Sequence, residues 1–148
     1  MSENLDGLVE QGGRGLRLQY ALEMDEEQAQ ILTAALEFYA RMSIGQWSEL
    51  AELVLDMRDN DYCEKRDALA NGLKKLRRIA FPDLGDTASY SVTSNPYTCR
   101  AWELYTVLRH RIAWTRHPEG GMAVCFYAPI SFSGKPLAQC IVREASGE

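Results

Sequence analysis

Long apolar runs are missing from this 148-residue sequence. None approaches the roughly 18 to 20 consecutive apolar residues that cross a bilayer, so a membrane-spanning protein is not expected. The first 15 residues also lack the basic start and apolar centre of a secretory signal peptide. We therefore expect the chain to act in the cytoplasm, with no membrane partner.

Residues that bind metals are scarce and scattered. The cysteines form no C-x-x-C pair, and only two histidines are present: Cys63, Cys99, Cys125 and Cys140, with His110 and His117. Metal sites usually show clustered ligand spacing. We expect no metal and no cofactor, and we interpret the cysteines as small apolar residues that stay reduced.

Familiar catalytic motifs are absent as well. The sequence contains no phosphate-binding glycine loop, no G-x-G-x-x-G, no G-x-S-x-G and no H-E-x-x-H. No catalytic residue is assigned, and a protein that is not an enzyme is favoured. One enzymatic alternative stays open, a small hydrolase in which His110 or His117 activates Cys99 or a serine.

What is present indicates one folded domain. Apolar residues make up 46% and charged residues 25%, which is the balance of a globular chain rather than a disordered one. The glycine-containing stretch 1–15 is typical of a flexible N-terminal arm. The domain is expected over residues 16–144, followed by a short tail at 145–148.

The net charge of −5 is unevenly distributed. Residues 1–59 carry twelve acids and four bases, whereas residues 60–148 carry nine acids and twelve bases. The overall sign disfavours general binding to nucleic acid. The excess of bases in residues 60–148 is compatible with a local anion site in that half.

Four helices are expected from the spacing of apolar residues. A capping box at Asp25 and Gln28 predicts the start of the first, which continues to about Met42. The second is expected from Gln46 or Trp47 to about Met57. The third spans about 62–80, and the fourth begins at Asn95 and Pro96 and ends near Trp114. The inward face of the third helix is predicted to consist of Leu69, Leu73, Leu76 and Ile79.

Strands are expected at the two ends of the domain. Residues 16–24 alternate between apolar and polar side chains, and residues 90–92, 122–128 and 137–143 have strand-like composition. The predicted fold class is therefore α+β, a small and mainly antiparallel sheet with about four helices packed on one face. Edge strands and aromatic-rich helices would also offer surface for self-association.

The densest cationic group lies at the end of the fourth helix, where Arg109, His110, Arg111, Arg116 and His117 gather. Two interpretations stay open. Cations in the last turn stabilise the negative end of a helix dipole, which also accounts for Lys74, Lys75, Arg77 and Arg78 in the third helix. Alternatively, arginine forks recognise an anion such as a phosphate.

The hydroxyls and ring of residues 89–91 supply the other groups that a nucleotide pocket needs. Tryptophans can stack on a base, and Gln46 and Trp47 follow a glycine at a predicted helix start, where anions are attracted. The candidate ligand-binding residues are Gln46, Trp47, Ser89, Tyr90, Ser91, Arg109, His110, Arg111, Trp114 and Arg116.

Four segments carry a family resemblance. ALEFYARMSIGQW at 35–47, ASYSV at 88–92, AWELYTVLRHRIAW at 101–114 and PEGG at 118–121 together resemble small accessory proteins of tailed bacteriophages and prophages. The resemblance covers most of residues 16–136 and departs from the usual form near residues 125–128. It implies a phage protein that acts in the host cytoplasm, and it supplies no catalytic residue.

These observations favour a non-catalytic accessory protein that counters host defence by binding and sequestering a nucleotide-like anionic signalling molecule. An alternative is an interaction protein that docks on a host defence protein through its acidic N-terminal half, residues 23–59. The small hydrolase is the third hypothesis.

Overall fold

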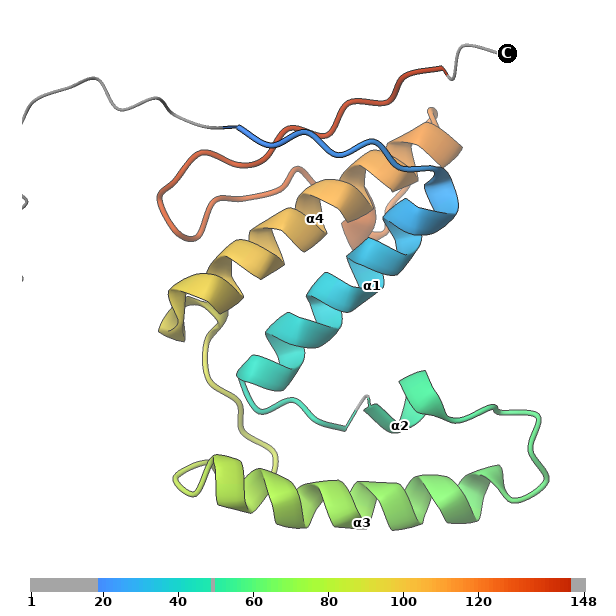
Figure 1. Cartoon of the computed structure of the whole chain (residues 1–148), viewed down its shortest axis with the longest axis vertical. Helices are drawn as coiled ribbons and strands as arrows, with labels where there is room; N and C mark the ends of the chain where they lie inside the picture. The colour runs from blue at the N-terminus through green and yellow to red at the C-terminus, as the bar shows by residue number, and fades with distance from the viewer. Residues whose placement is uncertain (1–18, 49, 145–148) are drawn as a thin grey trace, which may run out of the picture.

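The computed structural model describes residues 19–48 and 50–144. Within them the chain forms four α-helices and two short 3₁₀ turns, and no strand (Figure 1). The elements are α1 (Glu26–Ser43), α2 (Leu50–Val54), α3 (Tyr62–Ala80), η1 (Val92–Ser94), α4 (Pro96–Arg116) and η2 (Val124–Phe126). The described residues include no helix long and apolar enough to cross a membrane.

Helices α1 and α4 lie side by side and form the centre of the molecule (Figure 1). Both begin at the caps that the sequence predicts. Asp25 and Gln28 exchange the two hydrogen bonds of a capping box, and the Asn95 side chain accepts from the first backbone amides of α4, which starts with Pro96. The predictions of these two helix starts are confirmed.

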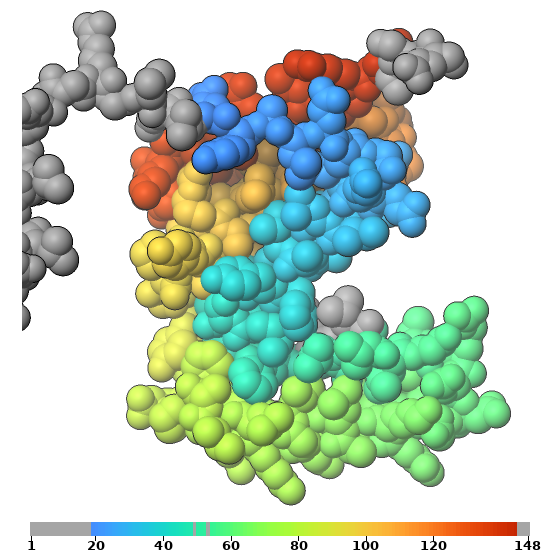
Figure 2. Space-filling model, viewed as in Figure 1, coloured from blue at the N-terminus to red at the C-terminus, as the bar shows by residue number. Residues whose placement is uncertain are grey.

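Helix α4 is buried on more than one side. Its buried residues are Thr98, Cys99, Ala101, Glu103, Tyr105, Val107, Leu108 and Ala113, which go almost round the helix rather than along one stripe. One side faces α1, and the chain that follows α4 runs back along another side (Figures 1 and 2). A glutamate in the middle of such a helix therefore needs polar partners.

Helices α2 and α3 contact each other, and α3 runs across the lower end of the α1 and α4 pair (Figure 1). Helix α3 has the bounds that its apolar spacing predicts. Its predicted inward face is only partly correct, because Leu73 is buried and Leu69 half-buried while Leu76 and Ile79 are 56% and 79% exposed. Helix α2 is shorter than predicted, since residues 45–48 form a turn instead of its first half.

The predicted α+β fold is wrong for the described residues, which are helical and form no sheet. Residues 19–25 are extended but unpaired, and Tyr20 and Leu22 are exposed. Residues 92–94 and 124–126 are 3₁₀ turns, and residues 137–144 have no regular structure. Alternation gives a segment one apolar face, but a strand also needs backbone hydrogen bonds to a neighbouring segment, and the described residues form no such pairing. Residues 16–18 of the first predicted strand and the terminal segments 1–15 and 145–148 lie outside the described residues.

Candidate functional site

One side of α4 carries a row of residues spaced by four: Glu103, Val107 and Arg111. Residues at this spacing lie above one another on a helix. The returning segment 129–141 runs beside this row. It is fastened at Glu103 and forms a groove beside Val107 and Arg111. The same face of α4 therefore carries both the glutamate that holds the returning segment and two residues of the groove.

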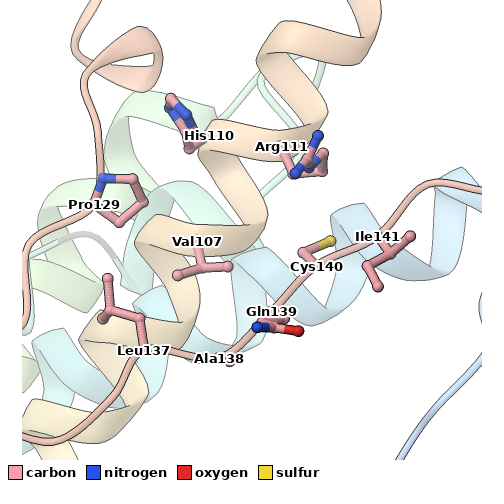
Figure 3. A pocket seen from close by; sticks show the side chains of 9 residues that line it. All are labelled: Val107, His110, Arg111, Pro129, Leu137, Ala138, Gln139, Cys140 and Ile141. Carbon is pink, nitrogen blue, oxygen red and sulfur yellow. The ribbon is translucent and has the colours of Figure 1, made fainter.

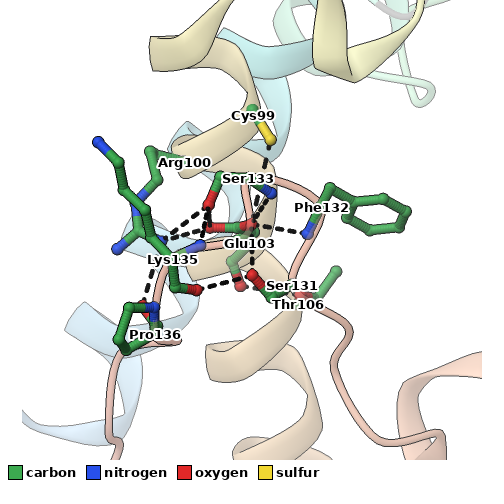
Figure 4. Close-up of polar contacts among 9 residues, drawn as sticks. All are labelled: Cys99, Arg100, Glu103, Thr106, Ser131, Phe132, Ser133, Lys135 and Pro136. Carbon is green, nitrogen blue, oxygen red and sulfur yellow. Dashed lines mark hydrogen bonds and ion pairs between the residues drawn. The ribbon is translucent and has the colours of Figure 1, made fainter.

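The Glu103 side chain is 2% exposed and is held by the loop 131–133 (Figure 4). Its Oε1 accepts from the backbone amides of Phe132 at 2.8 Å and Ser133 at 2.7 Å. Its Oε2 accepts from the Ser133 hydroxyl at 3.0 Å and the Arg100 guanidinium at 2.5 Å. The Ser131 hydroxyl also reaches Oε1 at 3.4 Å. The loop thus surrounds an internal carboxylate with donors, as loops do with bound anions.

Two opposing effects act on the Glu103 carboxyl. Burial alone would raise its pKa, but the amides of Ser133 and Phe132, the Ser133 hydroxyl and the Arg100 charge outweigh it, and the pKa lies below its ordinary value of 4.5. The charged form is therefore the one that the folded chain stabilises. Arg100 adds a second tie, because its Nη1 also donates to the Pro136 carbonyl at 3.2 Å.

The lowered pKa of Glu103 predicts a pH dependence of stability. Its contribution to the free energy of unfolding is complete above the ordinary pKa of 4.5 and is lost as the pH falls through the lower folded-state pKa. We expect wild type to lose more stability than Glu103→Gln between neutral and acidic pH. Urea unfolding of both proteins across this range measures the difference. Parallel pH profiles would contradict the assignment.

Beside this fixed point lies an open groove of about 360 Å³ (Figure 3). Its floor is α4 and its far wall is the returning segment. It is lined by Val107, His110, Arg111, Pro129, Leu137, Ala138, Gln139, Cys140 and Ile141. The size is within the roughly 300 to 1,000 Å³ of small-molecule sites, which combine apolar walls with a few polar groups.

Two of the predicted ligand-binding residues line the groove with unused donors or acceptors. The His110 Nδ1 atom is buried and has no hydrogen-bond partner among the residues that the structure describes. Within residues 19–48 and 50–144, no hydrogen bond or ion pair engages the exposed Arg111 guanidinium. A buried polar atom without a partner costs free energy, so it marks a place where an incoming polar group would be favoured.

The other predicted residues of α4 have partners in the protein. The Arg109 guanidinium donates to the Tyr105 hydroxyl at 2.9 Å and stacks on its ring. The Trp114 indole N–H donates to the Phe126 carbonyl at 3.2 Å. Arg116 pairs with Glu26 at 2.5 Å and so joins the end of α4 to the start of α1. These three side chains stabilise the fold around the groove.

The remaining predicted residues meet at a second place, the turn between α1 and α2. Gln46 donates to the Ser89 hydroxyl at 3.2 Å, and the Tyr90 amide donates to the Ile44 carbonyl at 3.0 Å. The Trp47 indole donates to the Met42 carbonyl at 2.9 Å, and Ser91 caps η1. Since η1 precedes α4 and His110 lies 14 residues beyond Pro96, about 20 Å along the helix, the two groups do not form one pocket.

Arg77 holds that second place together. It is 6% exposed, and its guanidinium donates to the carbonyls of Gly45 at 2.6 Å, Gly85 at 3.1 Å and Ala88. Gly45 has a φ of +87°, a conformation that favours glycine, and an added Cβ would lie 3.0 Å from Leu84. The interpretation of Arg77 as a cation that stabilises the helix dipole is therefore incomplete, because its guanidinium binds loop carbonyls.

The arrangement of the described residues gives no support to the hydrolase alternative. The Cys99 thiol lies 4.0 Å from the Glu103 carboxylate, and burial followed by this charge raises its pKa, the opposite of an activated thiol. His117 pairs with Glu119 at 3.3 Å on the surface. No group of three potential metal ligands occurs in the part of the chain that the structure describes.

Sequence reasoning identified His110 and Arg111 but missed Glu103 and its loop. The available signal was a single acid inside an otherwise apolar and aromatic helical stretch, together with a serine-rich turn that offers amides. Comparison of the chain with family models, with curated proteins and with solved structures gave no match.

Proposed function

We propose that the chain is a binding protein that takes a small organic anion of the nucleotide class in the groove between α4 and residues 129–141. The observation that carries this proposal is the pair of neighbouring residues His110 and Arg111. Among the described residues, neither the buried Nδ1 of His110 nor the guanidinium of Arg111 has a hydrogen-bond partner, and both residues line the same groove.

The groove favours a ligand with both a charged and an apolar part. A guanidinium binds phosphate oxygens through two parallel hydrogen bonds. The walls beside it are formed largely by aliphatic side chains such as Val107, Leu137 and Ile141, which suit a flat ring. The Gln139 amide adds donors and an acceptor. A phage accessory protein that sequesters a host signalling nucleotide would use such a site, and that setting stays a prediction.

The acidic N-terminal half is less well suited to be the main binding surface. Four of its acids are already paired within the protein: Glu26 with Arg116, Glu37 with Arg41, Asp56 with Arg58 and Asp59 with Lys65. Inhibition of a host protein through residues 23–59 therefore remains a second hypothesis. Because these acids already have partners, we favour the groove as the binding surface.

Calorimetric titration of the full chain with cyclic oligonucleotides and ADP-ribose derivatives tests the proposal. We expect at least one of these ligands to bind with micromolar affinity. Replacing Arg111 with glutamine should weaken that binding at least about tenfold, because a hydrogen bond to a charged group contributes roughly 1.5 to 3 kcal/mol.

The matched control is Arg66→Gln, which removes the same charge from the exposed side of α3. This variant should bind like wild type. The proposal fails if none of the ligands binds, or if Arg66→Gln and Arg111→Gln lose the same affinity.

A further inference from the structure

Helix α3 presents an apolar stripe that the rest of the described chain leaves largely exposed. Leu69, Gly72, Leu76 and Ile79 recur at intervals of three and four residues and so lie on one side of the helix. Leu76 and Ile79 are 56% and 79% exposed. The buried residues Leu73 and Arg77 mark the adjoining side of α3, which faces the rest of the chain, and the half-buried Leu69 lies at the boundary between the two sides.

The middle of the stripe allows another helix to come close. Gly72 lies near the centre of the 19-residue helix, and a Cβ placed there would meet no atom within 4 Å. A glycine in a helix interior costs about 1 kcal/mol relative to alanine. Leucine and isoleucine on either side of a small residue provide the apolar contacts of a helix crossing.

The charges along α3 decide what kind of partner fits. Residues 59–70 carry four acids and two bases, a net charge of −2, whereas residues 71–80 carry four bases and no acid, of which Lys74, Lys75 and Arg78 are exposed and Arg77 is buried. A second α3 that runs antiparallel places the acidic end of each helix beside the basic end of the other. A parallel one would oppose like charges. This pattern is therefore complementary to itself under twofold symmetry.

We propose that the chain forms a homodimer through antiparallel packing of α3 against α3 of a second copy, with Gly72 near the twofold axis. Leu69 and Leu76 lie within about one helical turn of Gly72, so in each copy they lie beside the crossing. The dimer leaves the groove beside α4 accessible, since α3 does not line it. The proposal is independent of the ligand.

Analytical ultracentrifugation of the full chain tests the dimer. Wild type should sediment as a dimer, and the double variant Leu76→Glu with Ile79→Glu as a monomer with an unchanged circular dichroism spectrum. The control Leu22→Glu changes another exposed leucine and should remain dimeric. A monomeric wild type, or a dimer that survives the double variant, would overturn the proposal.

Charge exchange and cross-linking test the orientation. Glu64→Lys and Lys75→Glu alter exposed residues without an ion pair in the described chain, and each reduces the opposite charges of the two ends of α3, so each should weaken the dimer. In a Cys63→Ser background, a short bifunctional maleimide should join two copies of Gly72→Cys but not two copies of Ile79→Cys. Cross-linking of Ile79→Cys would indicate parallel packing and contradict the antiparallel dimer.

Discussion

Replacing Glu103 with glutamine is expected to lower the free energy of unfolding by about 2 kcal/mol. The glutamine keeps the shape but replaces one carboxylate oxygen with an NH₂ group, which would face the Arg100 and Ser133 donors that now bond Oε2. Hydrogen bonds to charged groups contribute roughly 1.5 to 3 kcal/mol, and a buried donor without an acceptor adds a penalty. Urea unfolding followed by circular dichroism at neutral pH measures the change.

The same substitution should act locally as well. Loss of the Glu103 contacts should speed amide hydrogen exchange in residues 129–141, while the amides of α1 keep their protection. Glu52→Gln, at an exposed glutamate of α2, serves as the control and should leave both stability and exchange as in wild type. A Glu103→Gln protein with wild-type stability and wild-type exchange in residues 129–141 would show that the carboxylate does not hold the segment.

Replacing Arg77 with methionine is expected to cost about 3 kcal/mol of unfolding free energy. Methionine fills much of the same space but cannot donate to the carbonyls of Gly45, Gly85 and Ala88, which join α3 to the turn at Gly45 and to the turn at residues 85–88. Each of these bonds has a charged donor, and such bonds contribute roughly 1.5 to 3 kcal/mol before the freed carbonyls regain water. The same urea unfolding experiment measures the loss.

The neighbouring residue supplies the control for Arg77. Arg78 is exposed and pairs with Asp86 on the surface, so Arg78→Met should change stability little. Equal losses in the two variants would mean that removal of a positive charge from α3 matters more than the carbonyl contacts do. An unchanged Arg77→Met protein would contradict the structural role of the guanidinium.

The helices could be predicted because their signals are local. The capping box at Asp25, the proline after Asn95 and the apolar spacing of α3 each act within a few residues. The sheet could not be predicted correctly, because period-two alternation in residues 16–24 describes one segment and says nothing of a pairing partner. The prediction that Leu76 and Ile79 are buried failed for a similar reason. The width of an apolar stripe does not reveal how much of it a neighbouring element covers.

The candidate site, too, could be predicted only where its signals are local. The cationic cluster drew attention to His110 and Arg111, which line the groove, but local spacing could not separate them from Arg109 and Arg116, whose partners come from elsewhere on α4 and from α1. Glu103 was missed because its partners lie about 30 residues further along the chain. Arg77 was assigned to the helix dipole because the carbonyls that it binds belong to distant turns.

The most direct test of the account is amide chemical-shift mapping of the full chain during titration with ADP-ribose and with a cyclic dinucleotide. We expect a bound ligand to shift the amides of Val107, His110, Arg111 and residues 137–141, which line the groove from both sides. Because Arg111→Gln weakens binding, this variant should show much smaller shifts at the same subsaturating ligand concentration. Shifts centred on Gln46, Trp47 and residues 89–91, or none with either ligand, would contradict the assignment of the groove as the binding site.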